Sequence, residues 1–169
     1  MQSELKVSHD PENGFLFVDG ERSFSFRVKS FQASLDRLDI MTGKLVSQVL
    51  SDQMGKAIGR VGMDHWRTRI HSDDDLWKVT DEVLSVHGAG RCVGGEKREE
   101  GKTSRFIFRL KGTMTSYDHK ATEPTCHLMR GIVQGWMEGY LERNASSCIE
   151  TQCESTGSSE CVFEVTFNQ

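Results

Sequence analysis

The stretch that decides the fold is CHLMRGIVQGWMEGYLERNASSCIETQCESTGSSEC, residues 126–161. It contains four of the chain's five cysteines and a helical pattern striped with glycine. Three residues form the pattern E-x2-C-x7-C across a polar turn, and a further cysteine stands upstream at the start of the predicted helix. Thiolate and carboxylate ligands suit zinc, whose closed four-coordinate sites are structural rather than catalytic. The pattern therefore predicts a structural zinc site with the ligands Cys126, Glu150, Cys153 and Cys161.

Alternatives to this ligand set stay open from the residues alone. Cys148 lies two residues before Glu150, on the same side of a predicted strand, and could replace it as the fourth ligand. The thiols could also be free without any metal, or form a redox switch or an iron–sulfur site. Cys92 stands alone in the sequence and is most simply a bystander in the core or at the surface.

Length and composition predict one folded domain. The 169 residues are 36% apolar and 27% charged, which is ordinary for a globular chain of this size. The net charge of −4 and the lack of a concentrated basic face argue against direct nucleic-acid binding. Neither a secretory signal nor a run of roughly 18 apolar residues is present, so we expect a cytoplasmic protein that does not enter a membrane. Residues 1–13 are predicted as a flexible arm, and residues 14–169 as the domain.

The first half of the domain reads as a hairpin followed by helices. Asp19-Gly20 separates two runs of β-formers, residues 15–18 and 22–28, and the second alternates Phe24, Phe26 and Val28 with polar residues. Helical spacing then predicts helices over residues 30–42, 44–70 and 72–87. The longest has one apolar side formed by Leu45, Val49, Leu50, Met54, Ala57, Ile58 and Val61.

Glycines in two predicted helices share a four-residue spacing. Gly55 and Gly59 lie in the long helix, and Gly131, Gly135 and Gly139 lie in the helix over residues 126–142. Glycine inside a helix is unfavourable by roughly 1 kcal/mol relative to alanine, so it indicates a place where another backbone comes close. We therefore expect these two helices to cross face to face.

The second half of the domain reads mainly as strands. Residues 91–93, 105–110 and 113–117 are predicted strands, with a charged loop over residues 94–102, and residues 148–152 and 162–167 form the last hairpin. The predicted fold is α+β, an antiparallel sheet packed against several helices. Aromatic residues that could line an apolar pocket between the third helix and this sheet are Trp77, Phe106 and Phe108. No histidine pairs with a serine or cysteine in a recognisable nucleophile motif, so an enzyme is not the favoured interpretation.

Residues 126–166 also resemble a known family. The segments C-H-L-M-R-G-I-V-Q-G-W-x-x-G-Y, E-T-Q-C and G-S-S-E-C-V-F-E-V-T resemble the 4-vinyl reductase family of small-molecule-binding domains. The resemblance implies an α+β fold shared with subunits of Golgi transport-particle complexes and with haem nitric-oxide-binding domains. In phenol-sensing regulators with this domain, the C…E-x2-C-x7-C arrangement binds a structural zinc beside the aromatic-ligand pocket. This implies the same zinc ligands here, although the connection from Gly139 to Glu150 is slightly longer and introduces Cys148.

The resemblance orders the functional hypotheses. The first is a non-enzymatic sensor that binds a small apolar or aromatic molecule, such as a hydrocarbon, and acts through a homodimer or a partner. The second is a tetrapyrrole-binding or vinyl-reductase-associated protein of (bacterio)chlorophyll-type metabolism. The third is an assembly or scaffold subunit of the Golgi transport-particle type. The family's phenol-binding histidine and tryptophan have no counterpart that can be recognised by motif.

Overall fold

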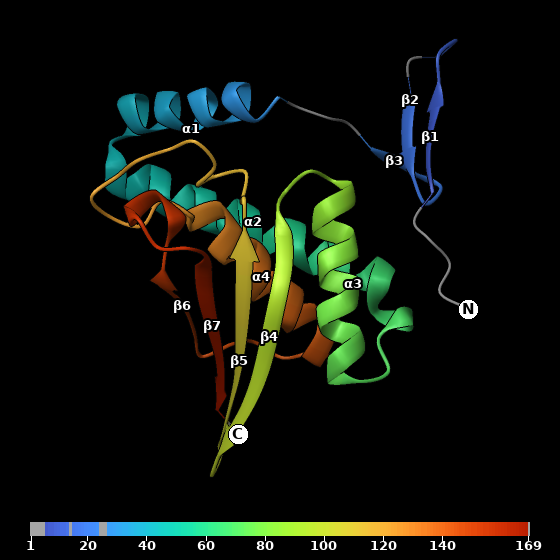
Figure 1. Ribbon diagram of the computed structural model, residues 1–169, viewed down its shortest axis with the longest axis vertical. Helices are drawn as coiled ribbons and strands as arrows, with labels where there is room; N and C mark the ends of the chain where they lie inside the picture. The colour runs from blue at the N-terminus through green and yellow to red at the C-terminus, as the bar shows by residue number, and fades with distance from the viewer. Residues whose placement is uncertain (1–5, 14, 24–26, 169) are drawn as a thin grey trace.

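The computed structural model describes residues 6–13, 15–23 and 27–168 (Figure 1). Within these residues, a small antiparallel sheet has the strand order β1-β2-β3 and a larger one the order β4-β5-β7-β6. The fold is α+β, as the sequence predicts. The strands are β1 (Val7–Asp10), β2 (Phe15–Val18), β3 (Glu21–Ser23), β4 (Arg91–Glu100), β5 (Thr103–Lys111), β6 (Ser147–Gln152) and β7 (Cys161–Asn168). The helices are α1 (Val28–Thr42), α2 (Lys44–Trp66), α3 (Asp73–Val86) and α4 (His127–Leu141), with short 3-10 turns η1 (Arg67–Arg69) and η2 (Glu154–Thr156).

The larger sheet, α4 and α2 form successive layers (Figure 1). Alternate residues of β5 and β7 point to the same face, where Phe106, Phe108 and Phe163 are buried. α4 packs against β6 and β7, and α2 packs against α4 on the side away from the sheet. α3 packs against the edge strand β4. The helices and one face of the sheet therefore enclose the core.

The crossing of α2 and α4 brings the two backbones into contact, as their glycines predict. A Cβ added to Gly55 would stand 2.1 Å from the Leu128 carbonyl oxygen. A Cβ added to Gly135 would stand 2.0 Å from the Lys56 carbonyl oxygen. No side chain larger than hydrogen fits either position unless a backbone moves, so the glycine stripes determine how closely the helices approach.

The sequence is wrong about which side of α2 is buried. The buried residues of α2 are mostly small: Ser47, Ser51, Gly55 and Gly59, followed by Met63 and Trp66 near the end. The predicted apolar side faces solvent instead. The reason is that α2 meets α4 through its glycines, so its large apolar residues point away from α4. The exposed large apolar residues of α2 are Leu45, Val46, Val49, Leu50, Met54, Ile58 and Val61.

The start of α3 follows the sequence prediction. Ser72 is the N-cap, and its hydroxyl accepts a hydrogen bond from the Asp75 backbone N–H. The Asp75 carboxylate in turn accepts hydrogen bonds from the Ser72 hydroxyl and the His71 backbone N–H. This reciprocal capping accounts for the acidic first turn without a bound cation.

Three local predictions differ from the structure. Residues 94–100 continue β4, because they pair with β5 and place ion pairs such as Glu96–Arg98 along the exposed edge. Residues 113–117 form a turn rather than a strand. Val28 begins α1 instead of ending a strand, while Phe24 and Phe26 lie outside the described residues. Of the predicted arm, residues 7–10 form β1 and pair with β2.

Candidate functional site

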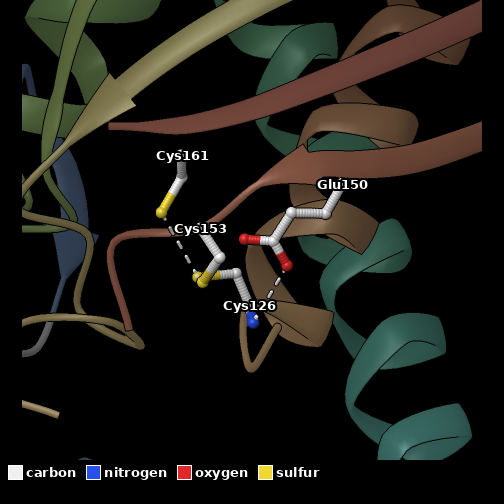
Figure 2. A group of neighbouring side chains, drawn as sticks. All are labelled: Cys126, Glu150, Cys153 and Cys161. Carbon is white, nitrogen blue, oxygen red and sulfur yellow. Dashed lines mark hydrogen bonds between the residues drawn. The ribbon is translucent and has the colours of Figure 1, made fainter. Parts of the chain in front are cut away.

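The cluster at the start of α4 draws its members from three places in the fold. Cys126 is the N-cap residue of α4, Glu150 lies on β6, Cys153 follows β6, and Cys161 begins β7. Figure 2 shows the three sulfur atoms turned toward one another and the Glu150 carboxylate turned toward Cys126. The Cys126 sulfur lies 3.7 Å from that of Cys153 and 3.6 Å from that of Cys161. One ligand atom from each of the four residues lies within 4.8 Å of all the others.

These distances fit a tetrahedral metal ion. Zinc–sulfur bonds of about 2.3 Å place two sulfur ligands of a tetrahedral zinc roughly 3.8 Å apart, close to the separations observed here. Glu150 Oε2 accepts a hydrogen bond of 3.3 Å from the Cys126 backbone N–H. Glu150 Oε1 is buried and has no hydrogen-bond partner among the described residues. A buried carboxylate oxygen without a partner is unfavourable, and a metal ion bound beside the sulfurs would satisfy it.

The electrostatics of the cluster also favour a cation. Burial raises the pKa of the Glu150 carboxyl to about 8. Hydrogen bonds to Cys153 and Cys161, together with burial, raise the pKa of the Cys126 thiol. Hydrogen bonds from Cys126 and Cys161 lower the pKa of Cys153. Without a cation, the cluster therefore holds less than its full negative charge, and a divalent ion would compensate four deprotonated ligands.

Polar groups around the cluster tie it to the turn after β5. The Thr113 hydroxyl lies 3.5 Å from the Cys126 sulfur, and the Glu154 backbone N–H donates to the Cys161 sulfur at 3.3 Å. The Ser116 hydroxyl donates to Glu154 Oε2 at 2.7 Å. The cluster thus connects the N-terminus of α4, the last hairpin and residues 113–116.

The two remaining cysteines lie outside this cluster. The Cys148 thiol donates to the Arg130 carbonyl oxygen at 3.5 Å, on the side of α4. Cys92 is buried on β4, and burial raises the pKa of its thiol to about 12. Neither thiol is part of the group whose ligand atoms converge.

A mainly apolar cavity of about 460 Å³ lies between α1, α2, α3, α4 and the sheet. Of the three aromatic residues expected around a pocket, Phe108 lines it. Trp77 covers Gly95 of β4 and packs edge-on against Phe108, with ring centroids 4.9 Å apart. Phe106 packs edge-on against Phe167 in the core. Other cavity-lining residues are Val28, Phe31, Met54, Ile58, Trp66, Leu84, Met114, Ile132, Val133 and Trp136.

Three side chains give the cavity wall its polar character. The indole Nε1 of Trp136 is buried and has no hydrogen-bond partner among the described residues. His87 Nδ1 lies 2.8 Å from the Val83 carbonyl oxygen, which only accepts, so Nδ1 carries the hydrogen. In the neutral ring, His87 Nε2 is then an acceptor. The Thr80 hydroxyl donates to the Leu76 carbonyl oxygen at 2.7 Å.

The sequence patterns did not single out His87 and Trp136 because these residues come from different helices. His87 is the C-cap residue of α3, and Trp136 lies on α4. The available signal was positional: Trp136 follows Ile132 by four residues, on the side of α4 next to the glycine stripe. Which histidine it would meet depends on helix packing, which sequence spacing does not give.

No helix in the described part of the chain has both the length and the apolar character needed to cross a bilayer.

Comparison with known proteins gives one family match and two informative folds. The chain is similar to the phenol-responsive sensory domain of the transcription activator PoxR, solved with phenol, with a TM-score of 0.80 and 15% identity over 95% of this chain and 84% of that one. It is also similar to a vinyl-4-reductase family protein from Methanocaldococcus jannaschii, with a TM-score of 0.54 and 19% identity over 85% of this chain and 82% of that one. No curated protein sequence gives a significant match. Residues 107–167, which include all four members of the cysteine and glutamate cluster, match the family model of the 4-vinyl reductase domain. The chain belongs to the 4-vinyl reductase domain family, which its last helix and strands resemble.

Proposed function

We propose that this chain is a sensory domain that binds one small aromatic or apolar molecule in the cavity between the helices and the sheet. The observation that carries the proposal is the pairing of a mainly apolar cavity of about 460 Å³ with one buried, unpartnered indole N–H. Binding sites for small molecules are typically a few hundred Å³ in volume and apolar, with a few polar groups that fix orientation. The fold shared with a phenol-responsive sensory domain supports the same interpretation.

The polar groups favour a hydroxyl-bearing ligand. Trp136 Nε1 is a donor without an acceptor among the described residues, and Nε2 of a neutral His87 is an acceptor at the same cavity. A phenolic hydroxyl both accepts and donates a hydrogen bond, so it complements this pair. Filling the rest of the cavity requires only apolar contact. We therefore expect phenol to bind more tightly than benzene.

A structural zinc ion belongs to the same proposal. It would join Cys126 at the start of α4 to Glu150, Cys153 and Cys161 on and beside the last two strands. α4 also carries Ile132, Val133 and Trp136 of the cavity wall. By fixing one end of α4, the metal would hold this wall in place, and no step of chemistry is assigned to it.

We propose further that the domain works as a homodimer, which would give a ligand-induced change in the cavity a route to another chain. The exposed apolar side of α2 supports this part of the proposal, because large apolar patches on soluble proteins usually mark interaction sites.

Calorimetric titration of the zinc-loaded protein with phenol and with benzene tests the ligand-binding proposal. We expect one site per chain, with phenol bound about tenfold more tightly than benzene because of one additional hydrogen bond. The variant Trp136→Phe should lose this preference while still binding benzene. Trp77→Phe is the matched control, because Trp77 lies outside the cavity lining, and it should bind phenol as the wild type does.

Failure of phenol and benzene to bind the folded wild type would contradict the proposal. Native mass spectrometry of the untreated protein adds a second arm to the test. A retained porphyrin would favour the tetrapyrrole hypothesis over a small aromatic ligand.

A further inference from the structure

The outer face of α1 and α2 carries an unusual amount of exposed apolar surface. We call this set the α1–α2 face, and its members are between 45% and 74% exposed. Those on α2 fall on one side of the helix at spacings of three to five residues, so they form a continuous stripe rather than scattered positions. The residues of the α1–α2 face are Ile40, Met41, Leu45, Val46, Val49, Leu50, Met54, Ile58 and Val61.

α1 itself lacks the packing that normally stabilises a helix. None of its 15 residues is buried, and among helices it packs mainly against α2. Its side-chain anchor to the rest of the domain is Gln32, whose amide donates to the carbonyl oxygens of Met114 and Tyr117. Helices shorter than about 15 residues are marginal in water unless tertiary packing buries one side. A further surface is therefore needed to cover α1 together with α2.

The amount of apolar surface matches one half of a stable dimer interface. At roughly 100 Å² of apolar area per fully exposed side chain, as transfer free energies imply, the α1–α2 face presents on the order of 500 Å². One side of a standard interface buries about 800 Å², of which about 60% is apolar, and this amounts to a similar area. A loose or incidental contact would not require so much.

Charges on α2 do not oppose self-association. Asp52 pairs with Arg130 at 2.8 Å, and Lys56 pairs with Glu138 at 2.8 Å, so both point toward α4. The stripe between Leu45 and Ile58 presents only apolar and amide side chains to the outside. Two copies related by a two-fold axis can therefore bring α2 against α2 without like charges meeting.

Two residues belong both to the α1–α2 face and to the cavity. Met54 and Ile58 line the cavity, yet they are 45% and 52% exposed on the outer side. The cavity wall is thus one side chain thick at this place, and solvent lies on its other side. A second copy covering these two residues would exclude that water and hold the wall closed around a ligand.

We propose that the α1–α2 face is the interface with a second copy of this chain, and that the second copy completes the cavity by covering Met54 and Ile58. The interface stands on exposure and packing alone, whereas the effect on the cavity rests on the proposed ligand-binding function. Because binding energies are reciprocal, phenol tightens the dimer by the same factor by which dimerisation tightens phenol binding.

Sedimentation velocity of the full chain, with and without phenol, tests the interface. The wild type sediments as a dimer at micromolar concentration. Leu45→Glu and Val61→Glu weaken dimerisation by about 100-fold, because a two-fold interface buries each new charge twice. Both positions are more than 70% exposed in the single chain, so circular dichroism should show an unchanged fold. Val93→Glu on β4, also an exposed apolar position, is the matched control and stays dimeric.

Calorimetry with phenol on the same proteins tests the effect on the cavity. The monomeric variants bind phenol about tenfold more weakly than the wild type or Val93→Glu. A monomeric wild type, or Glu variants that dimerise normally, would overturn the interface. Variants that are monomeric but bind phenol with wild-type affinity overturn the completion of the cavity, and leave the ligand-binding function intact. A dimer that binds no phenol overturns the ligand-binding function and supports the interface alone.

Discussion

Gly59 of α2 and Ile132 of α4 are in direct backbone contact, and both line the ligand cavity. A Cβ built on Gly59 would stand 2.1 Å from the Ile132 carbonyl oxygen. The close crossing of the two helices therefore does two things at once. It buries a helix pair without large side chains, and it forms one wall of the cavity.

Substituting Gly59 tests the crossing. Gly59→Ala should lower the free energy of unfolding by about 2 kcal/mol, because the methyl group forces two backbones apart. Urea denaturation monitored by circular dichroism measures the change. Gly62→Ala is the matched control on the same helix. Its added Cβ would meet only the Trp136 ring at 3.5 Å, so the helix-propensity gain of up to about 1 kcal/mol should leave stability equal or higher.

Removing one ligand tests the metal centre. Wild-type protein purified without added zinc should contain about one zinc ion per chain, measured by elemental analysis. Cys153→Ser should contain almost none, and its melting temperature should fall, because metal binding and folding are linked. Cys148→Ser should keep the metal, since that thiol contacts the Arg130 carbonyl oxygen instead. Zinc in the Cys153→Ser protein at wild-type level would contradict the assigned ligand set.

Removal of the metal should weaken ligand binding as well. Residues 113–116 contact the cluster through the hydroxyls of Thr113 and Ser116, and Met114 between them lines the cavity. A chelator should therefore reduce phenol affinity about tenfold, and re-addition of zinc should restore it. The readout is calorimetric titration of the same sample before chelation, after chelation and after re-addition. Unchanged affinity in a protein shown to be metal-free would mean that the two sites are independent.

Glu138 should make stability depend on pH. Its side chain is fully buried between α2 and α4, where it accepts hydrogen bonds from Lys56, Gln134 and the Ala145 backbone N–H. Burial opposes the charged form, but these hydrogen bonds outweigh it and hold the pKa of Glu138 below its ordinary value of 4.5. A lowered pKa contributes stability that is present above pH 4.5 and is lost as the pH falls through the folded-state pKa.

The variant Glu138→Gln isolates this contribution. At pH 7 its free energy of unfolding should be about 3 kcal/mol below that of the wild type, because Lys56 loses its charged partner. The difference should narrow as the pH is lowered below about 4.5, where the wild-type carboxyl becomes protonated. Urea denaturation of both proteins between about pH 3.5 and pH 7 measures it, and a difference that does not change with pH would contradict the assignment.

Sequence patterns predicted most of the metal site but only part of the packing. The spacing of Glu150, Cys153 and Cys161 on a tight hairpin limits where their side chains can lie, so their convergence could be predicted locally. Hydrophobic periodicity located α2 and its apolar side, but not the direction of that side. That direction depends on α4, whose glycine stripe accepts the glycines of α2 instead of its large residues.

Other features required the tertiary structure. The charged residues 94–100 look like a loop in sequence, yet pairing with β5 keeps them extended. The cavity combines His87 and Trp136 from separate helices, and no spacing within one segment relates them. Trp77, which aromatic character alone suggested for the pocket, packs over Gly95 because that glycine leaves room for an indole ring.

The position of the ligand is tested most directly by the indole N–H resonances in a proton–nitrogen correlation spectrum of the zinc-loaded protein. The chain has three tryptophans. On addition of phenol, we predict that the Trp136 Nε1–H resonance, assigned with the Trp136→Phe variant, shows the largest shift because its hydrogen atom gains an acceptor. The resonance of Trp77, outside the cavity lining, should stay in place. A saturating phenol titration that leaves Trp136 unmoved, or that moves Trp77 instead, would contradict the proposed site.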